Sequence, residues 1–236
     1  MRIITSIVAA MTVVACVVPV HAQPDASGHW KGTVQVQTMQ VAFDVDIVRT
    51  ANGSLTGTIG LPSQRIKGLP LQKIVIDGKE IAFYAREDQP FRGMFSADGT
   101  IAGDMSIEGL SAPFTMTRTG DAAVDAPPRS AGIAAAVAGT WTGALEADSR
   151  RLRLVISIER QADGTMVAEL TDVDEGGLRS PLKLTQDGSA LTLESVAIPA
   201  SISGALNADA TELAAAFTQG GATLPVTFRR SAPKER

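Results

Sequence analysis

Cysteine, histidine and aromatic side chains are scarce in this sequence of 236 residues, which contains one Cys, two His and 4% aromatic residues. A single cysteine cannot form an intramolecular disulfide, so the fold has to rest on its hydrophobic core. His29 is the only histidine beyond residue 22, and a lone histidine cannot form a typical zinc site. We therefore expect no disulfide framework, no metal site and no cofactor.

An excess of positive charge is also lacking. Lys and Arg total 21 against 25 Asp and Glu, which gives a formal net charge of −4 at pH 7. Proteins that bind nucleic acids present a basic face, and no cluster of Lys or Arg occurs along this chain. The composition therefore excludes nucleic acid as an expected partner.

Sequence signatures of hydrolytic catalysis are missing as well. No Gly-x-Ser-x-Gly elbow occurs. Ser180 to Lys183 and Ser231 to Lys234 both spell Ser-x-x-Lys, but that motif needs a helix, which the Pro inside each copy forbids. We expect no catalytic residues and no enzyme activity. A hydrolase-type enzyme with an unrecognised site is the alternative.

A group of carboxylates at Asp172, Asp174 and Glu175 precedes two glycines. Carboxylates around a glycine are one way to hold calcium. The spacing matches no known calcium loop, so a solvated acidic turn is the expected structure.

The first 22 residues have the three parts of a secretory signal peptide. Met1-Arg2 is a short positive start, Ile3 to Val20 is almost wholly apolar, and small residues precede a cleavage site after Ala22. Alternatively, Cys16 is the lipidated residue of a bacterial lipoprotein. No later apolar run is long enough to cross a bilayer. We expect a periplasmic or secreted protein without a transmembrane segment after the leader, or, in the alternative, a lipid-anchored one.

Two stretches, Gly28-His29-Trp30-Lys31-Gly32 and Gly139-Thr140-Trp141-Thr142-Gly143, share the pattern Gly-x-Trp-x-Gly. They begin two similar units, residues 28–119 and 139–230. Repetition on this scale predicts two duplicated domains, each with its own core. Between them, residues 120–138 are rich in Ala, and this composition predicts a linker. Its last residues, 133–138, favour a short helical turn that plugs one end of a barrel.

Alternating apolar residues predict β-strands at matching places in both units. The first unit has Val41, Phe43, Val45 and Ile47, and the second has Leu152, Leu154, Ile156 and Ile158. Turn signals such as Asn52-Gly53 and Asp163-Gly164 recur roughly every 8–12 residues. We expect an all-β protein of two tandem antiparallel up-and-down β-barrels with about eight strands each, because closure removes exposed strand edges.

The Gly-x-Trp-x-Gly first strand resembles that of the lipocalin and avidin superfold. Both units are also similar to a small repeat found ahead of the catalytic domain in many secreted bacterial α/β-hydrolases and β-lactamase-like serine hydrolases. The resemblance covers about four fifths of the chain and rests on Gly139 to Gly143, Leu152 to Val155, Ala162 to Thr165 and Thr218 to Pro225. It implies a non-catalytic barrel. Only six residues follow Arg230, so we expect two copies of the repeat without the hydrolase.

The second unit is the expected host of a ligand, because it has two Phe where the first unit has five. A space left by that loss of aromatic volume suits a small fatty or aromatic molecule. The candidate ligand-binding residues are Trp141, Leu152, Leu154, Ile156, Ile158, Leu191 and Leu193. We expect an exported binding or accessory module for such a ligand or for a secreted protein partner. The alternatives are a core that repacks without a cavity and a purely structural spacer.

Overall fold

The computed structural model describes residues 24–231 except 108, 148 and 149. The expected leader, residues 1–22, and its Cys16 lie outside the described residues, as does Lys234. Strands dominate, and the helical elements of the described part are two 3-10 turns, η1 (Pro62–Gln64) and η2 (Ala135–Val137). The prediction of an all-β fold is confirmed.

Within the described residues, no helix is both long enough and apolar enough to span a membrane.

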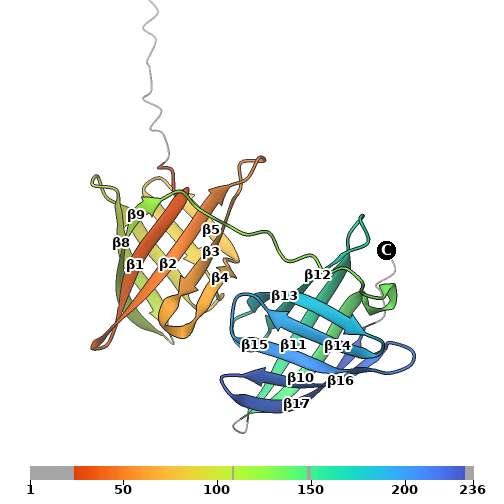
Figure 1. Ribbon diagram of the computed structural model, residues 1–236. Coiled ribbons are helices and arrows are strands. Elements are labelled where there is room, and N and C mark those ends of the chain that lie inside the picture. Colours follow the sequence, from red (N-terminus) through yellow and green to blue (C-terminus); the bar gives the residue numbers. More distant parts are fainter. Residues whose placement is uncertain (1–23, 108, 148–149, 232–236) are drawn as a thin grey trace, which may run out of the picture.

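The first unit is a nine-stranded antiparallel sheet in the order β4-β3-β2-β1-β9-β8-β7-β6-β5 (Figure 1). Its strands are β1 (Gly28–Val36), β2 (Met39–Arg49), β3 (Leu55–Leu61), β4 (Ile66–Pro70), β5 (Lys73–Asp77), β6 (Glu80–Tyr84), β7 (Pro90–Phe95), β8 (Thr100–Ile107) and β9 (Leu110–Gly120). The sheet curves around a single core, but its two outer strands, β4 and β5, do not pair with each other.

The second unit is a closed antiparallel barrel in which every strand pairs with its sequence neighbours (Figure 1). Pairing of β10 with β17 completes the barrel and places Trp141 opposite Arg230. The strands are β10 (Gly139–Ala147), β11 (Arg150–Arg160), β12 (Met166–Asp172), β13 (Leu178–Asp187), β14 (Ala190–Ser195), β15 (Ala200–Leu206), β16 (Glu212–Gln219) and β17 (Ala222–Arg230).

The prediction of a closed eight-stranded barrel is therefore right for the second unit and wrong for the first. The difference lies in the fourth strand. In the second unit this strand is the continuous β13, and Leu182 pairs both with Ala168 of β12 and with Ser195 of β14. One residue thus connects the two neighbouring strands, and the barrel closes.

Two consecutive residues share that role in the first unit. The Leu71 N–H donates to the Gly57 carbonyl of β3, and the Gln72 N–H donates to the Tyr84 carbonyl of β6. An extra residue opposite a ladder bends and locally disrupts a strand, as in a β-bulge. The fourth strand is accordingly split into β4, which pairs with β3, and β5, which pairs with β6. Between them, the hydrogen bonds of Leu71 and Gln72 connect the two outer ends of the sheet.

A buried tryptophan lies at one end of each unit. The Trp141 indole is 1% exposed, and its Nε1 donates to the Val137 carbonyl at 2.9 Å. Val137 is fully buried in η2, so the short helical turn predicted over residues 133–138 is present and covers this end of the barrel. Trp30 makes the matching hydrogen bond to the Ala26 carbonyl, also at 2.9 Å.

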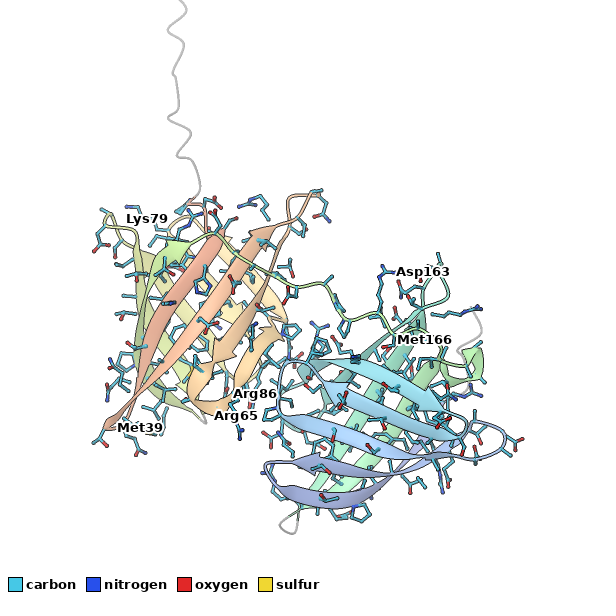
Figure 2. All side chains as sticks on the ribbon, viewed as in Figure 1. Met39, Arg65, Lys79, Arg86, Asp163 and Met166 are labelled. Atoms are coloured by element: carbon cyan, nitrogen blue, oxygen red, sulfur yellow. The ribbon has the colours of Figure 1, made fainter. Side chains whose placement is uncertain are left out.

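The two units touch through a set of contacts that we call the inter-unit joint. Figure 2 shows Arg86 on the side of the first unit that faces the second. The joint consists of Lys67, Gln72, Arg86 and Glu87 from the first unit, and of Glu175, Gly176, Gly177 and Ala197 from the second.

Gln72, one of the two residues at the strand break, is central to the joint. Its Nε2 donates to the Gly177 carbonyl at 2.7 Å and lies 3.2 Å from the Gly176 carbonyl. Arg86 Nη1 donates to Glu175 Oε2 at 3.0 Å. Ala197 of the second unit is 2% exposed and packs into the hydrophobic core of the first. The break in the first sheet therefore supplies a contact to the second barrel.

Candidate ligand-binding pocket

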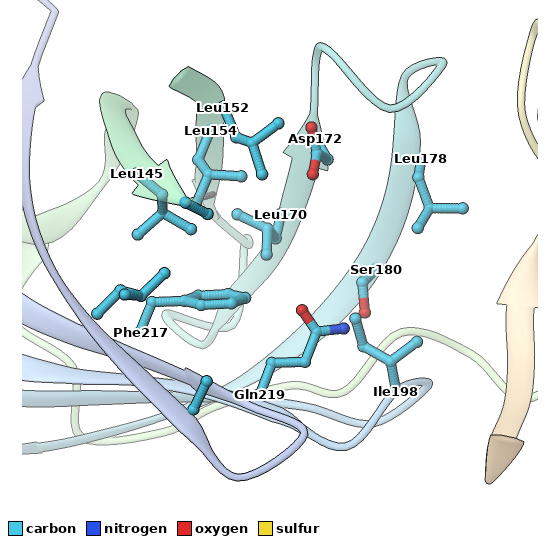
Figure 3. Close-up of a pocket in the computed structure, with 13 residues that line it drawn as sticks. Leu145, Leu152, Leu154, Leu170, Asp172, Leu178, Ser180, Ile198, Phe217 and Gln219 are labelled. Atoms are coloured by element: carbon cyan, nitrogen blue, oxygen red, sulfur yellow. The ribbon is translucent and has the colours of Figure 1, made fainter. Parts of the chain in front are cut away.

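The end of the second barrel opposite Trp141, which we call the open end, holds a pocket of about 300 Å³ (Figure 3). The side chains that line it come from strand ends and are mostly apolar: Leu145, Ala147, Leu152, Leu154, Leu170, Asp172, Leu178, Ser180, Ile198, Phe217, Gln219, Ala222 and Leu224. Small-molecule sites commonly enclose about 300–1,000 Å³. The pocket therefore suits a small, largely apolar ligand.

Two of the seven predicted ligand-binding residues, Leu152 and Leu154, line this pocket. They lie in the first half of β11, where alternate side chains point into the barrel. The other five lie deeper in the packed core and are between 0% and 3% exposed; they are Trp141, Ile156, Ile158, Leu191 and Leu193.

The core of the first unit contains packed aromatic side chains. Phe83 and Phe91 stack with their ring centroids 4.7 Å apart. Phe43 and Phe114 pack against Phe91, each with a centroid distance of 5.3 Å. All four rings are buried, and together they occupy the interior of the first unit.

Smaller side chains stand at the corresponding places of the second unit. Phe43 lies opposite Gly32 in the first ladder, and Leu154 lies opposite Gly143 in the second. The Phe83–Phe91 pair likewise corresponds to Leu193–Ile202. Of these second-unit residues only Leu154 lines the pocket, whereas Leu193 and Ile202 are buried in the packed core. Phe217 is the one aromatic residue of the pocket lining.

Asp172 is the one ionisable side chain of the pocket lining. It ends β12, and its Oδ1 accepts the backbone N–H groups of Asp174 and Glu175 at 3.2 and 3.1 Å. Burial raises the pKa of Asp172 above its ordinary value, and the two backbone hydrogen bonds oppose that rise. The pocket thus combines apolar walls with a half-buried carboxyl group.

The neighbouring carboxylates of the same loop are neutralised by arginines. Asp174 Oδ1 lies 2.6 Å from Arg153 Nη2, and this hydrogen bond lowers the pKa of Asp174. Glu175 lies between Arg86 and Arg150, at 3.0 and 3.3 Å. These ion pairs account for two of the three carboxylates that the sequence shows here.

Ser180 faces the pocket from β13 and is 2% exposed. Its Oγ is 2.5 Å from Ser195 Oγ, which in turn accepts the backbone N–H of Ile198 at 3.0 Å. Lys183, the other end of the Ser-x-x-Lys pattern, lies on the exposed face of the same strand. The pattern therefore does not bring the ammonium group to the hydroxyl.

A larger groove of about 910 Å³ is lined by the first unit, by residues 121–128 of the linker and by Pro181 and Val196 of the second unit. His29 belongs to its lining, and its Nδ1 lies 3.0 Å from Asp46 Oδ1. The same oxygen accepts the Ala123 N–H at 3.0 Å. This histidine–aspartate pair therefore fixes the linker to the first unit, and neither residue lines the pocket of the second barrel. In the part of the chain that the structure describes, no three His, Cys, Asp or Glu side chains are grouped as metal ligands.

Sequence reasoning missed the polar lining residues Asp172, Ser180 and Gln219. Asp172 was noticed only as part of an acidic turn. Its position at an even spacing from Leu170, Ala168 and Met166 is the signal that places it on the inner face.

No protein-family model matches the chain, and the search of curated proteins finds no match. Among solved structures, a candidate outer membrane protein from Bacteroides fragilis is 13% identical, with 87% of this chain and 97% of that chain covered and a TM-score of 0.26. A protein of unknown function from Nostoc punctiforme is 10% identical, with coverages of 87% and 96% and a TM-score of 0.25. The isotype 1 transferrin binding protein B from serogroup B Neisseria meningitidis is 15% identical, with coverages of 86% and 43% and a TM-score of 0.25. At such TM-scores these likenesses carry no conclusion about function.

Proposed function

We propose that this chain is a non-catalytic binding module that holds a small, largely apolar molecule in the open end of the second barrel. The pocket of about 300 Å³ is the observation that carries the proposal. Leucine side chains dominate its wall, and burial of an apolar ligand there gains roughly 25 cal/mol for each Å² removed from water. The resemblance of the Gly-x-Trp-x-Gly strand to that of lipocalin-like barrels agrees with this proposal.

The polar groups of the pocket favour binding over catalysis. Nucleophilic catalysis by a hydroxyl needs an adjacent base. The Ser180 hydroxyl is hydrogen-bonded to the Ser195 hydroxyl. The only described histidine, His29, lies in the other unit, where its side chain pairs with Asp46. Asp172, Ser180 and Gln219 line the pocket (Figure 3), and in this proposal they orient the bound molecule.

We also propose that the mature protein works in the periplasm or outside the cell, on the strength of the signal-peptide pattern of residues 1–22. The intact mass of the exported protein is expected to begin at Gln23. A mass that includes a lipid on Cys16 would contradict cleavage at that site and place the protein on a membrane.

Titration with a neutral fluorescent probe, N-phenyl-1-naphthylamine, tests the pocket. The full chain is expected to bind the probe saturably at one site. Leu224→Trp places a large ring in the mouth, where Leu224 lines the pocket, and is expected to weaken binding at least tenfold. Thr223→Trp is the matched control, because Thr223 is exposed on the same strand.

Two outcomes would contradict the proposal. One is the absence of saturable probe binding to the wild-type chain at a concentration where the protein is folded. The other is equal binding to wild type and Leu224→Trp, which would place the probe elsewhere.

A further inference from the structure

Asp172 occupies an inner position of the barrel wall. Along β12, Met166, Ala168 and Leu170 are buried at alternate positions, and Asp172 continues this series to the rim. Figure 3 shows its carboxyl group beside the pocket, on the same side as Leu154 and Leu170. Because side chains alternate along a strand, this carboxylate points toward the pocket and not toward the outer surface.

Only one oxygen of this carboxyl group is engaged by the protein. Oδ1 accepts the N–H groups of Asp174 and Glu175, whereas Oδ2 has no hydrogen bond or ion pair with any described residue. The arginines nearby are already paired, Arg153 with Asp174 and Arg86 with Glu175. A half-buried carboxylate without a cation is costly unless a partner is supplied.

The first unit has no carboxylate at the corresponding position. In the first unit the last inner residue of the corresponding strand β3 is Leu61, which follows the buried Ile59. That apolar end packs against the core of the first unit. The carboxylate of the second unit therefore has no counterpart in the packing of the first.

Two further polar groups face the same mouth. The Gln219 amide extends from the end of β16, and Figure 3 shows it beside Ser180 of β13. Together with Asp172 they are the polar side chains of a lining that is otherwise apolar, with Leu145 and Phe217 among its members. Such a lining suits a ligand with an apolar tail and a polar head.

We propose that the ligand is a small cationic amphiphile, whose ammonium group binds Asp172 and whose apolar tail fills the barrel. This inference rests on the proposed function and names the class of its ligand. The ammonium donates to Asp172 Oδ2, and the Gln219 carbonyl oxygen is a second acceptor at the mouth. Burial raises the pKa of Asp172, and an ammonium group bound beside it would favour the ionised carboxylate. The pocket of about 300 Å³ limits the tail to a short alkyl chain or a single ring system.

Competition among three ligands with the same eight-carbon tail tests the head group. Octylamine, octanol and octanoate are each titrated into the full chain saturated with N-phenyl-1-naphthylamine. Octylamine is expected to displace the probe at roughly tenfold lower concentration than octanol, which is the usual gain of a hydrogen bond to a charged group. Octanoate is expected to be the weakest competitor, because its negative carboxylate is repelled by the carboxylate of Asp172.

Asp172→Asn removes the charge and keeps the oxygen that accepts the two loop N–H groups. This variant is expected to lose roughly tenfold in octylamine affinity and to keep its affinity for octanol. Glu146→Gln is the matched control, because Glu146 is a solvent-exposed carboxylate of β10 that pairs loosely with Arg151 at 3.7 Å. It is expected to bind all three ligands like wild type.

The outcomes separate the two proposals. If all three ligands displace the probe equally, or if Asp172→Asn leaves octylamine binding unchanged, the head-group inference is wrong and the pocket remains. If Glu146→Gln weakens octylamine as much as Asp172→Asn does, general negative charge explains the preference and Asp172 has no specific role. If the probe itself does not bind wild type, the proposed function fails and this inference fails with it.

Discussion

The two units of this chain use similar strand ladders and fill them differently. The first encloses four packed phenylalanine rings, with Phe83 and Phe91 stacked at 4.7 Å. The second has the smaller Leu193 and Ile202 at the positions of that pair and keeps a pocket at its open end. The two units thus share the alternation of inner and outer side chains and differ in the volume of the inner ones, and Leu154, the counterpart of Phe43, lines the pocket.

The same comparison shows what one added residue does. Leu182 of the second unit pairs with both neighbouring strands, and the barrel closes. In the first unit that role is divided between Leu71 and Gln72, the fourth strand breaks, and the Gln72 amide reaches the second unit. An insertion that weakens one sheet therefore supplies a contact between the two.

The largest expected effect comes from removing the tryptophan of one unit. Trp141→Ala is expected to cost about 3–5 kcal/mol of the free energy of unfolding, the usual range for a buried aromatic side chain truncated to Ala. Calorimetry of the full chain should show the loss in the transition of the second unit only. Trp30→Ala is the matched variant for the first unit. A single transition lowered equally by both variants would contradict independent cores.

Next in size is the exchange of a second-unit residue for its aromatic counterpart. Leu193 is fully buried in the packed core, so Leu193→Phe is expected to cost about 1–3 kcal/mol by overpacking. Leu154 lines the pocket, so Leu154→Phe can extend into existing space and is expected to cost less. It should also abolish binding of the neutral probe. Chemical denaturation and probe titration of both variants measure the contrast, and equal costs with unchanged probe binding would refute it.

A smaller effect is expected at the inter-unit joint. Gln72→Ala removes the donor to the Gly176 and Gly177 carbonyls and is expected to weaken the coupling between the units by about 1–2 kcal/mol. Hydrogen exchange should then be faster in the loop that carries these glycines. Gln35→Ala, at an exposed hairpin of the first unit, is the control. Unchanged exchange in Gln72→Ala would show that the joint does not depend on this side chain.

The smallest effect concerns the pH dependence of stability. Burial raises the pKa of Asp172 in the folded state, so its contribution to stability is present at low pH and is lost as the pH rises through the folded pKa. Asp172→Asn cannot titrate, and its stability relative to wild type should therefore increase from acidic to neutral pH. Denaturation at several pH values measures this difference. A difference that stays constant with pH would contradict the raised pKa.

Much of the fold follows from local sequence patterns. The alternation along residues 41–47 and 152–158 predicts two strands that the structure contains as parts of β2 and β11. The break between β4 and β5 was not predicted, although its signal is present, because Asp77 follows Pro70 by one residue more than Asp187 follows Pro181. A one-residue difference in spacing is equally consistent with a longer turn. Only the pairing register of the strands shows that the extra residue interrupts the fourth strand.

The pocket was predictable only in part. The aromatic count favoured the second unit, and two of the seven candidate residues, Leu152 and Leu154, line its pocket. Ligand binding by these residues stays a prediction. The polar lining was missed because residues at strand ends, such as Asp172 and Gln219, look like turn residues in a sequence. Which end of a barrel stays open depends on where η2 packs, and that is a tertiary contact.

Methyl NMR of the full chain during titration with N-phenyl-1-naphthylamine tests the central claim most directly. We predict saturable shifts in methyl signals of the second unit at the pocket, with Leu152, Leu154 and Leu178 among them. Methyl signals of Ile47 and Ile59, which lie in the filled core of the first unit, are predicted to remain unchanged. Shifts that are equal in both units, or absent from the second, would contradict the account. Its central claim is that aromatic side chains fill the core of the first unit, whereas the second unit, which has fewer of them, keeps a pocket that binds a ligand.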